Sequence, residues 1–218
     1  MAMMTTDEIL DILETMFPNA HCELEHKNPF ELLVAVVLSA QTTDAAVNKV
    51  TPALFEAFPT PQAMAEADIK DIEDKIRRIG LYRNKARSIK NLSQSLLDTF
   101  DGVVPEDMKK LTSLAGVGRK TANVVRSVCF DIPSIAVDTH VERISKRLGL
   151  AKVSDSVEVV EQKLKRKLRR ERWNRAHHLF IFFGRYFCTA RNPKCEDCPF
   201  QSFCKKDKLE AYKKEHKG

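Results

Sequence analysis

The sequence has 218 residues and a mass of 24.8 kDa, enough for one large domain or two small ones with a buried core. Hydrophobic residues make up 43% of it and charged residues 30%, with 7 glycines and 9 prolines, which excludes fibrous and disordered proteins. The longest largely apolar run, residues 32–40, is too short to cross a bilayer, and the acidic start shows no secretory signal. We therefore expect a globular protein of a reducing, intracellular compartment with no membrane partner.

Positive charge is concentrated in the last third of the chain, within a formal net charge of +6. Residues 1–150 hold 18 Lys and Arg against 21 Asp and Glu, whereas residues 151–218 hold 18 against 9. Such asymmetry is typical of proteins that meet a polyanion, usually nucleic acid, but a solvated basic helix surface produces it equally well. Charge alone does not decide between these interpretations.

Apolar residues recur with helical spacing nearly everywhere, and the alternation typical of strands is absent. An apolar stripe from Ile9 to Phe17 predicts a first helix that ends at Pro18. Residues 30–40 are apolar nearly all round, which predicts a helix in the core of a larger bundle. The fold class that follows is all-α.

Capping residues predict the limits of the later helices. The expected signals are Thr60-Pro61 and Asp68 at two helix starts, Gly80 as a helix end, and Asp101-Gly102 as the stop of a helix over 82–100. In the C-terminal part, Gly149 is expected to end one helix, and Ser154-Asp155 to cap a basic helix that runs to about Arg170.

The segment from Leu111 to Val128 departs from this amphipathic pattern. Gly116, Val117 and Gly118 form a tight turn between a short helix and a second helix that begins near Gly118. The exposed N–H groups of such a turn and of the helix start suit a phosphate, as in a helix-hairpin-helix element that grips the DNA backbone. A plain interhelical turn is the alternative.

Four of the six cysteines lie close together in the tail, at Cys188, Cys195, Cys198 and Cys204. In a reducing compartment, thiols at this spacing indicate a metal site rather than disulfides. A single CxxC flanked by wider gaps favours a 4Fe-4S cluster over zinc, without excluding zinc. Arg191 and Lys194 lie within the loop between the cysteines and would be available for phosphates.

Lys120 and Asp138 are the candidates for chemistry. Lys120 lies beside Arg119 and at the positive end of a helix. The cation and the helix dipole both disfavour a protonated lysine, so we expect an amine that can act as a nucleophile. The alternative is a lysine that only contacts phosphate. Asp138 opens a helix and could serve simply as its N-cap, but near an amine it would form a nucleophile and base pair.

Together these motifs resemble the endonuclease III family, bifunctional DNA glycosylases with apurinic/apyrimidinic (AP) lyase activity. The resemblance rests on 114–125 (LAGVGRKTANVV), 137–143 (VDTHVER), 38–44 (LSAQTTD), 79–82 (IGLY) and the spaced cysteines. It implies a six-helix barrel domain over residues 22–132, containing the helix-hairpin-helix. A second helical domain, over 1–21 and 133–218, would carry the 4Fe-4S cluster, with the active site in the cleft between the two.

The resemblance also implies roles for single residues. Lys120 would attack C1′ of a nucleotide that has left the base stack, and Asp138 would act as its acid/base and electrostatic partner. Gln41 would fill the vacated hole and Leu81 would insert on the opposite strand, although a helix-end polar residue and a core contact are the structural alternatives. Gly116, Val117 and Gly118 would hold the DNA backbone.

The implied substrate is double-stranded DNA that contains oxidised or saturated pyrimidines or abasic sites, met by a monomer in the cytoplasm at the nucleoid. A sister group removes adenine opposite oxidised guanine; it generally lacks the lysine and carries an extra C-terminal domain. The presence of Lys120 and a chain that stops soon after Cys204 favour the bifunctional enzyme. A non-catalytic helix-hairpin-helix module with a structural metal is the alternative from another class.

Overall fold

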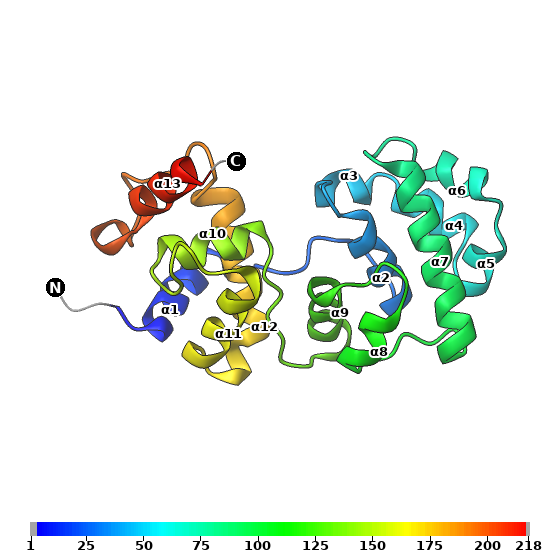
Figure 1. Ribbon diagram of the computed structural model, residues 1–218, viewed down its shortest axis with the longest axis horizontal. Helices are drawn as coiled ribbons and strands as arrows, with labels where there is room; N and C mark the ends of the chain where they lie inside the picture. Colours follow the sequence, from blue (N-terminus) through cyan, green and yellow to red (C-terminus); the bar gives the residue numbers. More distant parts are fainter. Residues whose placement is uncertain (1–3, 217–218) are drawn as a thin grey trace. The chain divides into compact units, whose positions relative to one another are not determined.

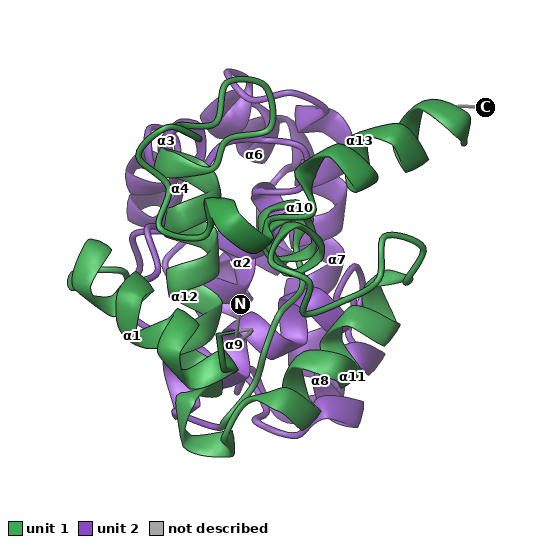
Figure 2. Cartoon of the chain, turned by 90° about the vertical axis from the view of Figure 1, so that its left-hand side faces the viewer, with its two compact units in different colours: residues 1–21, 133–218 green, residues 22–132 purple. Residues whose placement is uncertain are grey.

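The computed structural model describes residues 4–216, in which helices are joined by turns and loops without any strand (Figure 1). The chain divides into two compact units, here called the hairpin unit, Cys22–Ile132, and the cysteine unit, which holds the chain up to His21 and from Pro133 onward (Figure 2). Within the described range, no helix combines the length and apolar character that a membrane span requires. The all-α class expected from the sequence is confirmed.

The hairpin unit consists of helices of very different length packed around a buried central helix. Its helices are α2 (Pro29–Leu38), α3 (Asp44–Asn48), α4 (Thr51–Ala57), α5 (Pro61–Glu66), α6 (Ile69–Ile76), α7 (Tyr82–Phe100), α8 (Met108–Ser113) and α9 (Arg119–Phe130). Many begin at a side chain that accepts a backbone N–H, as Thr60 does for Ala63 and Asp68 for Lys70, both as predicted.

Helix α2 forms the centre of this unit. Every residue from Phe30 to Leu38 is buried, and the helix packs against α7 and α9. Apart from Glu31, its buried residues are all apolar, because all sides of the helix are covered. This agrees with the predicted core helix, although the helix ends at Leu38 rather than Ala40.

Helix α7 spans the predicted residues and ends where Asp101 adopts a left-handed conformation, followed by Gly102 at φ +76°. The expectation that Gly80 ends the preceding helix is wrong. Helix α6 already ends at Ile76, and the left-handed residue of the connecting turn is Leu81 at φ +58°, directly before α7. A non-glycine residue therefore occupies the strained position of this turn.

The cysteine unit combines the N-terminal helix with the C-terminal part of the chain. Its elements are α1 (Thr6–Met16), α10 (Thr139–Arg147), α11 (Val157–Lys167), η1 (Arg170–Arg172), α12 (Trp173–Phe182), η2 (Phe183–Phe187), η3 (Gln201–Phe203) and α13 (Lys206–Glu215). Buried apolar side chains of α1, α10, α11 and α12 form one core.

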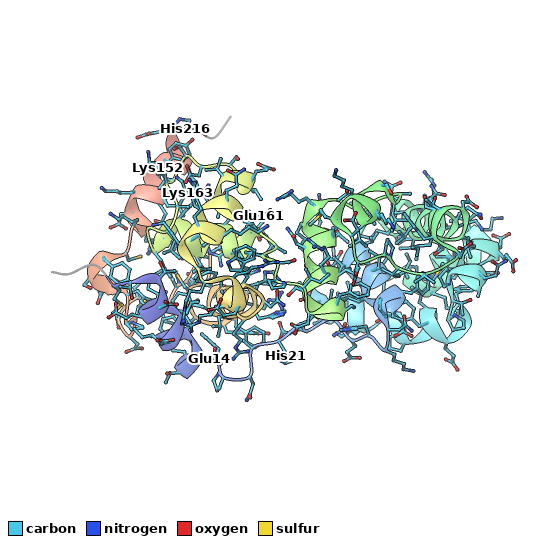
Figure 3. All side chains as sticks on the ribbon, turned by 90° about the horizontal axis from the view of Figure 1, so that it is seen from below. Glu14, His21, Lys152, Glu161, Lys163 and His216 are labelled. Carbon is cyan, nitrogen blue, oxygen red and sulfur yellow. The ribbon has the colours of Figure 1, made fainter. Side chains whose placement is uncertain are left out.

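Ion pairs fasten α1 to residues more than 150 positions away. Arg172 pairs with Asp7 at 3.0 Å and with Asp11 at 2.7 Å. Arg175 pairs with Glu14 at 2.6 Å, and Glu14 is labelled in Figure 3. These bonds run from the start of α12 to successive turns of α1. They add to the core contacts of Ile9, Leu10 and Leu13, which join the first helix to the C-terminal part of the unit.

The basic helix α11 is shorter than expected. Ser156, not Ser154 or Asp155, is its N-cap and accepts from the N–H of Val159, and the helix ends at Lys167 rather than near Arg170. Asp155 instead accepts the N–H of Lys152 at 2.6 Å. The predicted end of α10 near Gly149 is confirmed, since Gly149 follows its last turn with φ +72°.

Candidate functional site

The glycine turn of the hairpin unit joins α8 to α9. Gly116 adopts φ +75°, which only glycine takes without strain, and Gly118 is the N-cap of α9 with no side-chain cap. Val117 is 5% exposed and its N–H donates to the carbonyl of Leu114 at 3.1 Å. Val117 thus anchors the turn, and Gly116, Gly118 and the first N–H groups of α9 are the donors suited to a phosphate.

Lys120 lies in the first turn of α9, two residues after the N-cap, and its side chain is exposed. The first turn of α9 is the positive end of the helix dipole, and Arg119 precedes Lys120 in the chain. Lys120 therefore lies directly after the glycine turn, as the sequence predicted.

Gln41, Leu81 and Gly116, three candidates from separate segments, line one pocket of about 230 Å³ in the hairpin unit. Thr121, the residue after Lys120, lines it as well. The two wedge candidates that the family resemblance implies and one glycine of the expected phosphate-binding turn thus line the same pocket.

The two wedge candidates share an unusual backbone conformation. Gln41 has φ +54° and Leu81 φ +58°, the left-handed region that non-glycine residues rarely enter. Both side chains are exposed, and Leu81 exposes 58% of its surface although it is a large apolar residue. Such strained positions, each costing about 1–3 kcal/mol, cluster at functional sites.

Lys85 is a member of the same pocket that the sequence reasoning left without a role. Its side chain is only 5% exposed, its ammonium donates to Oγ1 of Thr42, and burial lowers its pKa. A signal was present in the sequence, because Leu81 and Lys85 follow Gly80 as Val117 and Thr121 follow Gly116. A buried lysine at the pocket wall adds positive charge beside Gln41 and Leu81.

In the cysteine unit, Asp138 is the N-cap of α10 and half-buried. Its Oδ1 accepts the N–H of His140 at 2.9 Å and that of Val141 at 2.8 Å. Within the described part of this unit, Oδ2 has no hydrogen-bond partner and remains available for a ligand. The capping role foreseen as an alternative is real, but it uses only one of the two carboxylate oxygens.

The strand-like segment before Asp138 is held by α12. The ring Nδ1 of His177 lies 2.9 Å from the carbonyl oxygen of Ala136, and the N–H of Ser134 donates to Oδ1 of Asn174 at 2.8 Å. His177 itself is 2% exposed. These contacts fix the position from which the Asp138 carboxylate projects.

The four tail cysteines line one small pocket at the end of the cysteine unit. Among residues 4–216, no three His, Cys, Asp or Glu side chains are grouped closely enough to hold a metal ion, so the thiols surround a space and do not converge on a point. Four thiolates around a larger body are the ligand set of a 4Fe-4S cluster. Burial, reinforced by the neighbouring Cys188, raises the pKa of the Cys198 and Cys204 thiols, so metal binding there must release protons.

Two buried arginines of α10 face this cysteine loop, and both were missed from the sequence. Arg147, 2% exposed, donates to Sγ of Cys188 at 3.1 Å and to the carbonyl of Thr189 at 2.8 Å. Arg143, 8% exposed, donates to the carbonyl of Gly184 at 2.7 Å. Their i, i+4 spacing on an otherwise polar helix places both on one face, which was the available signal.

Arg191 and Lys194, the loop candidates, are both exposed. Lys194 lines the cysteine pocket, where its ammonium lies 5.9 Å from the centre of the Phe187 ring. The candidate residues are divided between the two units. The hairpin unit holds Lys120, Gln41, Leu81 and Gly116, and the cysteine unit holds Asp138 and the cysteine loop.

Comparison with known proteins gives consistent results. The model of the HhH-GPD superfamily of base excision DNA repair proteins matches residues 34–170, and that of the iron-sulfur binding domain of endonuclease III matches residues 188–204. The second match begins at Cys188 and ends at Cys204, the outer two of the four clustered cysteines.

Curated proteins similar to this chain include bacterial endonuclease III enzymes. That of Bacillus subtilis (strain 168) is 52% identical over 96% of this chain and 94% of its own length, and that of Escherichia coli (strain K12) is 44% identical over 93% and 96%. A solved structure of a trapped endonuclease III–DNA covalent intermediate is 54% identical, with a TM-score of 0.90, over 96% of this chain and all of that one. The chain therefore belongs to the endonuclease III family, and is a base-excision-repair DNA glycosylase and AP lyase with a 4Fe-4S cluster.

Proposed function

We propose that this chain excises oxidised or saturated pyrimidines from double-stranded DNA and then cuts the strand on the 3′ side of the abasic site, with Lys120 as the nucleophile. The observation that carries the proposal is the likeness to a trapped covalent endonuclease III–DNA intermediate at 54% identity. A covalent intermediate needs a nucleophile, and Lys120 is an exposed amine beside a turn suited to phosphate.

The proposed reaction begins when the amine nitrogen of Lys120 attacks C1′ of the extruded nucleotide. The bond between C1′ and the base breaks, and the base leaves with a proton. Opening of the sugar ring then gives a Schiff base between Lys120 and C1′. Loss of a proton from C2′ and cleavage of the C3′–O bond cut the strand, and water finally releases the lysine.

Asp138 is proposed as the electrostatic partner in this reaction. Its Oδ1 is committed to the two capping bonds of α10, which hold the carboxylate in one orientation. Its Oδ2 can stabilise the positive charge that develops on the sugar and can help to move a proton. The proposal thus assigns the nucleophile to the hairpin unit and the carboxylate to the cysteine unit.

Gln41 is proposed to fill the space left by the extruded nucleotide, and Leu81 to insert on the opposite strand. The support is their shared exposure, their left-handed backbone and the pocket that both line with Gly116. An exposed apolar side chain on a strained turn suits insertion between bases, because unstacking is costly unless the gap is filled. Gly116 and Gly118 would hold the neighbouring backbone phosphate through their N–H groups, while Val117 supports the turn.

The four thiolates of Cys188, Cys195, Cys198 and Cys204 are proposed to hold the cluster, whose bonds would order a loop that has little core of its own. Arg147 would orient Cys188 through its hydrogen bond to the sulfur. Arg191 and Lys194 would contact phosphates of any sequence, so replacing them with alanine should flatten the salt dependence of DNA binding.

The test uses two duplexes, one with a single thymine glycol and one with adenine opposite 8-oxoguanine. We expect the purified protein to cut the first duplex at the lesion, and Lys120→Ala not to cut it. Lys109→Ala, which removes another exposed lysine near the same turn, is the matched control and should keep full activity.

Two outcomes would contradict the proposal. Excision of adenine without strand cleavage would indicate the mismatch-specific relative, and binding of both duplexes without excision would indicate a non-catalytic module. We also propose that the enzyme acts as a monomer at the nucleoid in the cytoplasm, where its DNA substrate would lie. A single elution volume matching 24.8 kDa would support the monomer.

A further inference from the structure

The cysteine unit contains a second, strongly basic pocket that lies away from Asp138. It encloses about 810 Å³, within the range of small-molecule sites, and is lined by Lys146, Gly149, Leu150, Ala151, Lys152, Val153, Ser154, Lys163, Arg166, Lys167, Lys205 and Lys208. Lys146 and Gly149 lie at the C-terminal end of α10, whereas Asp138 caps its N-terminus. The length of α10 therefore separates the pocket from the proposed chemistry.

Seven of the lining residues are cations, and none is an acid. Two of them are neutralised, since Lys146 pairs with Glu142 at 2.6 Å and Lys163 with Asp155 at 2.5 Å. The other five, Lys152, Arg166, Lys167, Lys205 and Lys208, are exposed and form no ion pair among residues 4–216. Figure 3 labels Lys152 and Lys163, two members of the wall.

Helix stabilisation explains only part of this charge. Arg166 and Lys167 lie in the last turn of α11, where cations complement the helix dipole. Lys205 and Lys208 instead lie at the N-cap and in the first turn of α13, where the dipole disfavours cations, and Asp207 in the same turn does not line the pocket. The dipole of α13 therefore does not account for these two cations.

The pocket also has an apolar floor. Leu150 and Ala151 are buried at 5% and 7% exposure, and the half-buried Val153 continues their surface. A duplex presents its phosphates on a convex surface and would leave such a hollow unfilled. A compact ligand with several phosphates and an apolar face would occupy both the floor and the cationic rim.

We propose that this pocket binds a nucleoside polyphosphate, with the phosphates on the five unpaired cations and the nucleoside against Leu150, Ala151 and Val153. The chemistry recognised is the phosphate group, which free nucleotides share with the DNA backbone. Concavity and the apolar floor favour the free nucleotide.

The test is calorimetric titration of the cluster-loaded full-length protein with ATP, pyrophosphate and adenosine at about 0.15 M salt, which screens weak surface attraction. ATP and pyrophosphate should bind and adenosine should not. The double variant Lys167→Gln/Lys208→Gln should weaken ATP binding by about five- to tenfold. Lys167→Arg/Lys208→Arg should retain the wild-type affinity, because the charge is kept.

The matched control is Lys213→Gln/Lys214→Gln, which removes the same charge from exposed positions of α13 outside the pocket. Its ATP affinity should stay within twofold of wild type. Equal weakening in both variants, or no binding of ATP by the wild type at millimolar concentration, would overturn the proposal. Displacement of ATP by undamaged duplex DNA, with an equal loss of duplex affinity in the pocket variant, would assign the surface to DNA instead.

Discussion

Replacement of Asp138 by asparagine separates the capping role of this residue from its proposed chemical role. Both capping bonds, at 2.9 and 2.8 Å, end on Oδ1, an atom that asparagine can supply as an amide oxygen. Asn is as good an N-cap as Asp, so the variant should lose only the interaction of its charge with the helix dipole, about 0.3–1 kcal/mol. Asp138→Ala should also lose the cap, about 0.5–2 kcal/mol.

The chemical cost should be much larger than the structural one. Loss of one electrostatic group that acts on the transition state typically reduces turnover by about 10²–10³-fold. We expect this loss in single-turnover excision of thymine glycol by Asp138→Asn, with unchanged affinity for the duplex, because the carboxylate acts on the transition state more than on the ground state. The thermal midpoint should stay within about 4 °C of wild type.

Thermal unfolding and single-turnover kinetics on the same three proteins therefore decide the role. Turnover in Asp138→Asn close to wild type would refute the chemical role. A fall in stability and DNA affinity as large as the fall in turnover would identify Asp138 as a folding residue only.

Three further outcomes follow from the structure. Leu81→Gly should keep or raise the thermal midpoint, because glycine relieves the left-handed strain, yet slow excision, whereas Asp101→Gly at another left-handed position should leave excision unchanged. Arg147→Met should reduce the iron content per chain, because the Cys188 sulfur and the Thr189 carbonyl lose a buried donor worth about 1–3 kcal/mol; full iron loading would contradict this. Burial, helped by the charges of His177, Arg175 and His21, lowers the pKa of His178 to about 3. Between pH ~6.5 and about 3, the unfolded state therefore binds a proton at His178 that the folded state does not bind. The free energy of unfolding, measured with urea, should fall on acidification through this range by up to about 1.4 kcal/mol per pH unit. The fall should be smaller in His178→Gln.

The sequence predicted most of the helices because the signals for them are local. The stripe of α1, the largely apolar α2 and the span of α7 follow from periodicity and capping alone. One error arose because the residue expected to cap a helix makes other contacts instead. Asp155 was expected to cap α11 but is engaged by the N–H of Lys152 and the ammonium of Lys163.

The features that the sequence predictions missed were a strained non-glycine turn and the burial of charged side chains. The left-handed turn before α7 uses Leu81 although Gly80 is adjacent, a choice that local propensity opposes. The buried positions of Lys85, Arg143 and Arg147 depend on carbonyl and hydroxyl partners distant in the chain. Charged residues are interpreted as exposed until such partners are known.

The candidate site was predictable at the level of motifs. The glycine turn, Lys120 after it and the clustered cysteines are contiguous patterns with a physical purpose, and each has the expected local structure. Asp138 was less certain from the sequence, because an N-cap explains an aspartate at a helix start completely. Only the geometry shows that capping leaves one carboxylate oxygen available.

Borohydride trapping measures the proposed covalent step most directly. Reduction during the reaction with a duplex that contains one abasic site should convert the Schiff base into a stable amine linking protein and DNA, visible as a slow band on a denaturing gel. We expect this band for the wild type and for Lys109→Ala, and none for Lys120→Met, whose DNA binding should persist. An adduct formed by Lys120→Met in wild-type yield would place the nucleophile elsewhere and contradict the assignment of Lys120.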